Sequence, residues 1–145
     1  MSLRLSSETL HASTVSLNGR AVLITGISGS GKSDLALQLI DRGFTLVSDD
    51  QTMVRKSGER LLASAPPTIA GKLEIRGIGI VEMETATDVP ISLVVDLTSE
   101  MERLPDNSRE RSVLGIPVPL ISVDAMTASA PAKVALALDR FGRTT

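Results

Sequence analysis

Short apolar runs separated by turn residues predict a chain built mostly of β-strands. The runs are rich in Val, Ile and Leu and have the length of buried strands, at residues 21–24, 44–47, 91–97 and 118–123. Two further pairs of strand-like runs flank turn signals, at Asn18-Gly19 and at residues 56–59. Because Asn-Gly is the strongest short hairpin signal, the run over 20–24 is expected to pair antiparallel with the run before it.

Helical periodicity marks two segments. Residues 34–40 carry apolar side chains at helical spacing and are followed by Gly43, which is a stop signal. Residues 132–140 form the second predicted helix, with Pro131 near its first turn. With about eight or nine strands and two helices, the pattern predicts an α/β domain with a mixed, largely antiparallel sheet rather than an alternating βαβ chain.

Composition narrows the class of protein. The 145 residues suggest one domain over 1–145, and 42% hydrophobic with 22% charged residues is an ordinary globular balance. A net charge of -2 predicts no basic surface for nucleic acid. The absence of cysteine excludes disulfides, thiolate metal sites and cysteine nucleophiles, and it is compatible with the cytoplasm. No run reaches membrane-spanning length, and residues 1–7 lack the apolar core of a signal peptide.

A match to G-x-x-x-x-G-K-[ST], the phosphate-binding loop, joins the strand over 20–24 to the helix over 34–40. Its residues are Gly26, Ile27, Ser28, Gly29, Ser30, Gly31, Lys32 and Ser33. Glycines let backbone N–H groups turn toward phosphate oxygens, and the following helix adds the positive end of its dipole. Lys32 can reach the β and γ phosphates, and the Ser33 hydroxyl can ligate Mg²⁺. A chance glycine-rich turn is the competing interpretation, but the flanking strand and helix favour a nucleoside triphosphate.

Asp49 and Asp50 follow the predicted strand over 44–47. Ligands collect at the carboxyl ends of strands in α/β sheets. A carboxylate there can hold Mg²⁺ or accept a proton from an attacking hydroxyl. A polar turn is the alternative, because paired aspartates are common in turns.

Four other polar residues could either contribute to a functional site or be ordinary surface or structural residues. Glu74 and Arg76 alternate with apolar residues, so on a strand they would share one face, toward solvent or toward a site. His11 is the only histidine, and an isolated histidine is usually a surface or satisfied polar residue. Arg103 lies in the charged segment 101–111, which is predicted to be a solvated surface segment or short helix.

Several of these features occur in one order: His11, the phosphate-binding loop, residues 42–50 ending in Asp49-Asp50, and Leu73-Glu74-Ile75-Arg76-Gly77-Ile78-Gly79-Ile80. This order resembles the catalytic, C-terminal domain of HPr kinase/phosphorylase over about residues 8–140. The Glu-Ile-Arg-Gly stretch is far more specific to that family than the loop is. The chain resembles the short, single-domain form, and the family fold is similar to that of phosphoenolpyruvate carboxykinase.

The resemblance implies an ATP- and Mg²⁺-dependent kinase that phosphorylates one serine of HPr, the phosphocarrier protein of the sugar phosphotransferase system. It also implies the reverse phosphorolysis, in which inorganic phosphate removes that phosphoryl group and yields pyrophosphate. Family members assemble as hexamers, so a cytoplasmic homo-oligomer without nucleic-acid or membrane partners is expected.

The resemblance also assigns roles to residues. Asp50 would accept the serine proton in the forward direction and return it in reverse, and Asp49 would share or support that role. Lys32 would stabilise charge on the transferred group. Ser33 and Glu74 would bind Mg²⁺. His11 and Arg103 would be part of the active site.

Two departures from the family pattern matter. The family's Pro-x-Arg-Pro-Gly-Arg stretch, linked to phosphorolysis, corresponds here to residues 123–133, which contain no arginine. The segment after Ile80 lacks the usual Phe-Gly and the longer loop. Kinase activity is therefore expected to exceed phosphorylase activity. Two alternatives remain open: a kinase for a small hydroxylated metabolite, and a nucleotide-sensing regulatory module, although the paired Asp49-Asp50 favours transfer over sensing.

Overall fold

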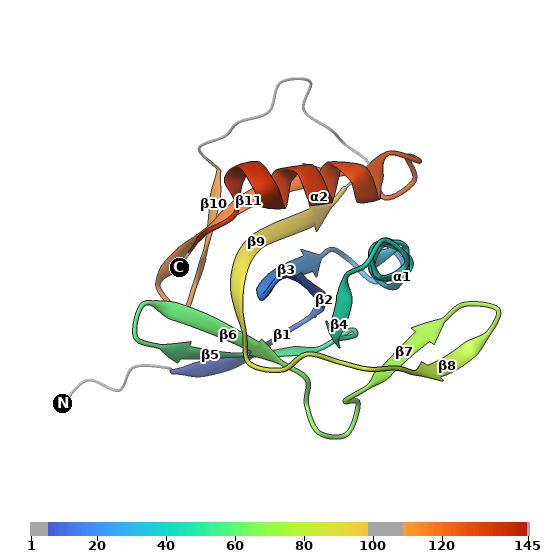
Figure 1. The fold of residues 1–145 in the computed structure, drawn as a ribbon, viewed down its shortest axis with the longest axis horizontal. Coiled ribbons are helices and arrows are strands. Elements are labelled where there is room, and N and C mark those ends of the chain that lie inside the picture. Colours follow the sequence, from blue (N-terminus) through green and yellow to red (C-terminus); the bar gives the residue numbers. More distant parts are fainter. Residues whose placement is uncertain (1–5, 99–108, 145) are drawn as a thin grey trace.

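In the computed structural model, the described residues are 6–98 and 109–144. Within them lie eleven strands and the helices α1 (Lys32–Asp41) and α2 (Ala130–Phe141), as Figure 1 shows. The strands are β1 (Ser7–Leu10), β2 (Ala12–Leu17), β3 (Arg20–Thr25), β4 (Thr45–Ser48), β5 (Thr52–Ser57), β6 (Arg60–Ser64), β7 (Lys72–Ile75), β8 (Gly79–Glu82), β9 (Val89–Leu97), β10 (Glu110–Val113) and β11 (Ile116–Val123).

Nine of the strands form one curled sheet. Its order is β1-β5-β6-β9-β3-β2-β4, with β11 also beside β9 and β10 beside β11. β9 is parallel to both β3 and β11, and the other neighbouring pairs are antiparallel. The predicted mixed, largely antiparallel sheet is therefore confirmed. β7 and β8 form a separate two-stranded ribbon that projects from the body (Figure 1).

The predicted Asn-Gly hairpin joins β2 to β3. Asn18 and Gly19 have φ values of 53° and 75°, the left-handed conformation that two-residue hairpin turns require. The two strands are paired in register from Ala12↔Thr25 to Leu17↔Arg20. This pairing fixes the start of β2 beside the end of β3.

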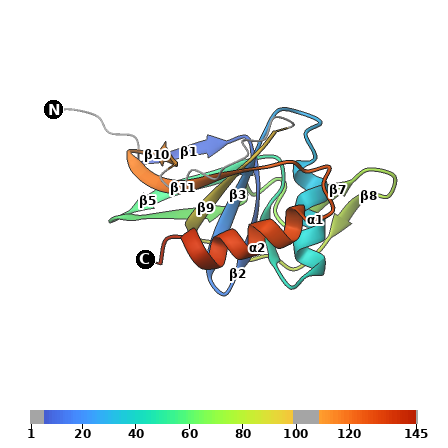
Figure 2. The ribbon, with the colours of Figure 1, turned by 90° about the horizontal axis from the view of Figure 1, so that it is seen from above.

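Side chains alternate between two packed layers on the faces of the sheet. Val22 and Ile24 belong to the cluster that contains the buried residues of α1 and α2, and both helices cover this face (Figure 2). Ala21 and Leu23 belong to the opposite cluster, which is formed with β5, β6, β10 and β11. The central strand is therefore buried on both faces, as its continuous apolar run predicts.

Three local predictions differ from the structure, in addition to the strand count, which is eleven in the described residues rather than the predicted eight or nine. The strand through Glu74 ends at Ile75, so Arg76 lies in the turn to β8 rather than on the strand. Both helices begin two residues before their predicted starts: Gly31 is the N-cap of α1, and Pro131 lies in the first turn of α2, where proline is favoured. Of the predicted surface segment 101–111, residues 101–108 lie outside the described residues, whereas Arg111 lies in β10 and pairs with Val118 of β11.

Ends of strands that are distant in the sequence lie together along one edge of the sheet. β2 is antiparallel to both β3 and β4, so β3 and β4 run in the same direction, as β9 and β11 do with β3. The carboxyl ends of β3, β4, β9 and β11 and the amino end of β2 therefore lie along that edge. No helix in the described part of the chain is long and apolar enough to cross a membrane.

Candidate phosphate-binding and phosphoryl-transfer site

The phosphate-binding loop follows β3 and turns directly into α1. Gly26 is required by space as well as by conformation, because a Cβ there would lie 2.6 Å from Ser30 Oγ. Gly31 is the N-cap of α1 with φ 100°, and no side chain caps the first turn. The N–H groups at this helix end are therefore available to an anion, as a phosphate site requires.

Lys32 is held inside the loop. Its side chain is only 6% exposed, and Nζ donates hydrogen bonds to the carbonyl oxygens of Gly26 at 3.0 Å and Ile27 at 3.1 Å. The ammonium group thus lies beneath the loop with its charge balanced by backbone dipoles. Phosphate oxygens entering the loop would offer it stronger, charge-assisted partners.

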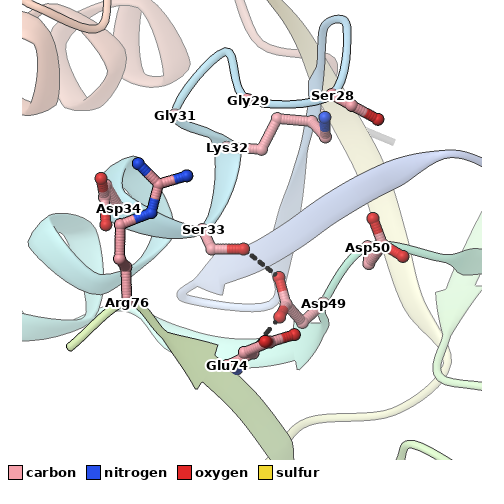
Figure 3. A pocket seen from close by; sticks show the side chains of 10 residues that line it. All are labelled: Ser28, Gly29, Gly31, Lys32, Ser33, Asp34, Asp49, Asp50, Glu74 and Arg76. Atoms are coloured by element: carbon pink, nitrogen blue, oxygen red, sulfur yellow. Dashed lines mark hydrogen bonds between the residues drawn. The ribbon is translucent and has the colours of Figure 1, made fainter. Parts of the chain in front are cut away.

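Asp49 is buried and accepts hydrogen bonds on both carboxylate oxygens. Oδ1 accepts the Ser33 hydroxyl at 2.7 Å, and Oδ2 accepts the backbone N–H of Glu74 at 3.2 Å (Figure 3). Oδ1 also accepts the Ser13 hydroxyl at 2.9 Å. Since all of these groups are donors, they suit an ionised carboxylate. With its proton directed at Asp49, the Ser33 hydroxyl keeps its lone pairs for a cation.

Asp50 points away from its neighbour and is exposed (Figure 3). Its Oδ1 lies 2.8 Å from His11 Nε2, and both side chains are more than half exposed, at 66% and 51%. Its backbone has φ 67°, a left-handed conformation that aspartate tolerates better than most residues do. The structure thus separates the two aspartates that the sequence left equivalent: one faces Ser33, and the other faces His11 and solvent.

A pocket of about 390 Å³ lies between the loop and the β7 ribbon. The predicted site residues that line it come from the loop and from three acidic positions, and Arg76 lines it as well; they are Ser28, Gly29, Gly31, Lys32, Ser33, Asp49, Asp50 and Glu74. Arg76 reaches toward the start of α1 from the turn after β7, so it faces the site although the strand ends before it (Figure 3). We call this the donor pocket.

The residues of the donor pocket fit Mg²⁺. Hydroxyl and carboxylate oxygens at Ser33, Asp49 and Glu74 are the hard ligands that this ion prefers. Within the described ranges, no group of three or more His, Cys, Asp or Glu side chains converges as a dedicated metal cage. Mg²⁺ commonly takes one or two protein carboxylates and completes its shell with substrate phosphates and water.

A second pocket, of about 690 Å³, lies on the other side of the loop. Its lining residues include His11, Thr25, Asp96 and Arg111, together with the exposed Met126. Asp96 accepts the Thr25 hydroxyl at 3.1 Å, whereas the Arg111 guanidinium makes no hydrogen bond or ion pair with the described residues. The two pockets share Gly29 and meet at the contact between His11 and Asp50. We call this second space the acceptor-side pocket.

Sequence reasoning missed three residues of this region. Asp96 is the penultimate residue of β9 and could have been found by the same strand-end rule that drew attention to Asp49 and Asp50. Arg111 was assigned to a solvated surface segment, and Ser13 was one polar position among several in β2, so neither had a sequence signal. The predicted active-site residue Arg103 lies outside the described residues.

The strand, glycine loop and helix, with Lys32 inside the loop and Ser33 paired to a buried carboxylate, define a phosphate-binding-loop protein. Residues 4–138 match the family model described as the HPr Serine kinase C-terminal domain. The chain belongs to this family.

Individual relatives agree with the family match. The chain is 38% identical over 128 residues to HPr kinase/phosphorylase of Latilactobacillus sakei, covering 79% of the chain and 41% of that protein. It is 36% identical over 133 residues to HPr kinase/phosphorylase of Clostridium botulinum, covering 83% and 44%. The chain therefore spans less than half the length of these curated relatives. The solved HPr(Ser) kinase/phosphatase of Coxiella burnetii superposes with a TM-score of 0.81 and 30% identity, over 92% of this chain and 89% of that one.

Proposed function

We propose that this chain catalyses the ATP- and Mg²⁺-dependent phosphorylation of a serine in the phosphocarrier protein HPr, with phosphorolysis as a weaker reverse activity. One observation carries the proposal: Asp49 is buried on Ser33, whereas Asp50 is exposed beside His11. A nucleotide sensor needs the first carboxylate but has no use for the second. The names of the relatives support HPr as the acceptor rather than a small metabolite.

In this proposal, the donor pocket holds the triphosphate. Backbone N–H groups of the loop and the Lys32 ammonium bind the phosphate oxygens, and Ser33 and Glu74 hold Mg²⁺ while Asp49 orients the Ser33 hydroxyl. Mg²⁺, when bound there, would supply positive charge that neutralises the charge developing on the phosphates during transfer. The chain itself thus supplies position and charge, which are the main requirements of phosphoryl transfer.

Asp50 carries the proton transfer in the proposal. The acceptor serine Oγ forms a bond to the γ-phosphorus while the bond from that phosphorus to its bridging oxygen breaks, so that ADP leaves and Asp50 takes the serine proton. In reverse, an oxygen of inorganic phosphate bonds to the phosphoserine phosphorus, the bond to the serine Oγ breaks, and Asp50 returns the proton. Pyrophosphate is then the second product. The hydrogen bond to His11 orients Asp50 for both directions.

The proposal extends to architecture and location. The large sheet draws its strands from across the described chain, which supports one catalytic domain over residues 1–145. The family resemblance supports a hexameric assembly and a cytoplasmic location. Sedimentation of the purified chain tests the assembly: a mass of about six chains is expected for a closed symmetric oligomer of this kind, and a monomer would contradict it.

The experiment that tests the function incubates the chain with labelled ATP, Mg²⁺ and HPr from the same cell. We expect acid-stable label on HPr, and no label on an HPr variant whose acceptor serine is replaced by alanine. ATP binding without labelled HPr would favour the sensing alternative. Label on a small hydroxylated compound from the same cell, with none on HPr, would favour a metabolite kinase.

A further inference from the structure

Ser13 of β2 connects the two aspartates through a single hydroxyl. The residue is fully buried, and its Oγ lies 2.9 Å from Asp49 Oδ1 and 3.1 Å from the backbone nitrogen of Asp50. The backbone N–H can only donate, so the serine oxygen accepts it and the serine proton is directed to Asp49. The result is a chain of hydrogen bonds in one direction, from the Asp50 backbone through Ser13 to the Asp49 carboxylate.

Ser13 stabilises both residues at the ends of this hydrogen-bond chain, Asp49 and Asp50. Asp49 must keep its Oδ1 on the Ser33 hydroxyl, and Ser13 is a second donor to that same oxygen, which fixes the orientation of the carboxylate. Asp50 has φ 67°, a conformation that persists only when its surroundings support it. The Ser13 hydroxyl pairs the N–H of that residue, and the same conformation places the Asp50 carboxylate against His11.

The strand that carries Ser13 is well suited to hold this position. β2 lies between β3 and β4 in the sheet, and Ser13 pairs with Ile24 in the register of β2 and β3. The aspartates, in contrast, lie on the irregular segment after β4, which has no sheet neighbour to fix it. A hydroxyl projecting from the sheet can therefore set the geometry of both carboxylates.

We propose that Ser13 is a positioning residue that couples the metal side of the site to the base side. It holds Asp49 on Ser33, so that the Ser33 lone pairs face the cation, and it holds Asp50 in the conformation that meets His11. This inference rests on the proposed function. It assigns a role to a position outside the phosphate-binding motif and outside the predicted site residues.

The test measures binding of a non-hydrolysable ATP analogue by calorimetry at a series of Mg²⁺ concentrations, followed by turnover. For Ser13→Ala, the Mg²⁺ concentration that gives half-maximal binding should rise about 10–100-fold, the usual effect of removing a partner that orients a metal ligand. Turnover at saturating Mg²⁺ should fall as well, because Asp50 is released. Ser13→Cys keeps nearly the same volume but is a weak donor, so it should shift the Mg²⁺ requirement in the same direction without a cavity.

Thr14→Val is the matched control. Thr14 is the next residue on the strand and is also fully buried, but its hydroxyl pairs with Thr52 Oγ1 at 2.8 Å and contacts neither aspartate. This variant should lower the melting temperature while leaving the Mg²⁺ requirement within about twofold of the native value. A merely structural role for Ser13 would give Ser13→Ala the same behaviour.

The outcomes separate this inference from the function on which it rests. A native chain that binds no nucleotide at any Mg²⁺ concentration would overturn the proposed function, and the role of Ser13 with it. Native Mg²⁺-dependent binding that Ser13→Ala and Ser13→Cys leave unchanged would overturn the role of Ser13 alone. An equal shift in Thr14→Val would also overturn it, because the effect would then belong to the strand rather than to the hydroxyl.

Discussion

The donor pocket and the acceptor-side pocket flank the same loop, but their lining side chains differ in burial and in hydrogen bonding within the protein. In the donor pocket, Lys32 and Asp49 are buried and hydrogen-bonded within the protein. In the acceptor-side pocket, the Arg111 side chain has no polar partner in the described residues, and the lining residues Ile27 and Met126 are 81% and 90% exposed.

This difference teaches which ligand each pocket suits. A triphosphate presents the same oxygens at every turnover, so fixed donors that need no rearrangement bind it efficiently. A pocket lined by large exposed apolar side chains suits a partner surface that brings its own groups to complete the contacts. The comparison therefore agrees with nucleotide on one side of the loop and a protein acceptor on the other.

The largest expected effect is in the donor pocket. Lys32→Ala removes the ammonium inside the loop, so transfer should fall by about 10³-fold or more, the scale of a cation that stabilises phosphoryl transfer. The rise in melting temperature that ATP with Mg²⁺ gives the native chain should be lost as well. Lys133→Ala is the control, because Lys133 is exposed on α2. Full transfer by Lys32→Ala would show that the loop does not act on the phosphates.

The next effect lies where the two pockets meet. Asp50→Asn keeps the shape of the side chain and removes its basicity, so turnover should fall about 10²–10⁴-fold. ATP binding should stay within about twofold of native, since Asp50 does not contact Ser33. If Asp50→Asn retained turnover while Asp49→Asn lost it, the assignment within the pair would be reversed.

A smaller effect distinguishes the two directions of reaction in the acceptor-side pocket. The phosphorolysis direction must hold a phosphorylated serine beside inorganic phosphate, and extra fixed cations would serve that purpose. The segment before and at the start of α2 brings no arginine, and Lys133 is exposed. Pyrophosphate release from serine-phosphorylated HPr should therefore be slower than the forward reaction on the same preparation. Comparable rates would show that another group, such as one from a neighbouring subunit, supplies the missing charge.

Arg111 sharpens that prediction because it brings a permanent cation to the acceptor-side pocket. Arg111→Ala should reduce the residual phosphorolysis by about 10–100-fold, the scale of a hydrogen bond to a charged group. The forward reaction, whose acceptor serine is uncharged, should change less. Arg109→Ala is a matched control, because it also removes one positive charge two residues away. The Arg109 guanidinium already donates a hydrogen bond to Ser122 Oγ at 2.8 Å. Equal losses in both variants would reduce the effect to general electrostatics.

The central strands could be predicted from the sequence because continuous apolar runs mark strands that are buried on both faces. β1 and β10 were missed, since both are short and polar and owe their strand structure to pairing with β5 and β11. The loop could be predicted because its chemistry lies in contiguous residues. The division between Asp49 and Asp50 could not, because it depends on Ser13 and His11, which are 36 and 39 positions away in the chain.

The acceptor-side pocket could not be predicted from the sequence either, because residues far apart in the chain form it. Arg111 comes from a charged stretch that matches a solvated surface, and the pairing of β10 with β11 brings it to the pocket. Arg76 shows the converse: the predicted strand ends before it, yet the side chain still faces the donor pocket. Pattern identifies what a segment contains, whereas strand order and register decide what it faces.

The central claim is that Asp49 supports Mg²⁺ binding, whereas Asp50 transfers the proton. Mg²⁺-dependent nucleotide binding tests this claim most directly. Calorimetry with a non-hydrolysable ATP analogue should show that Asp49→Asn raises the required Mg²⁺ concentration by about 10–100-fold. Asp50→Asn should leave that concentration within about twofold of native while it abolishes most turnover. The opposite result, a Mg²⁺ shift in Asp50→Asn and none in Asp49→Asn, would contradict the account.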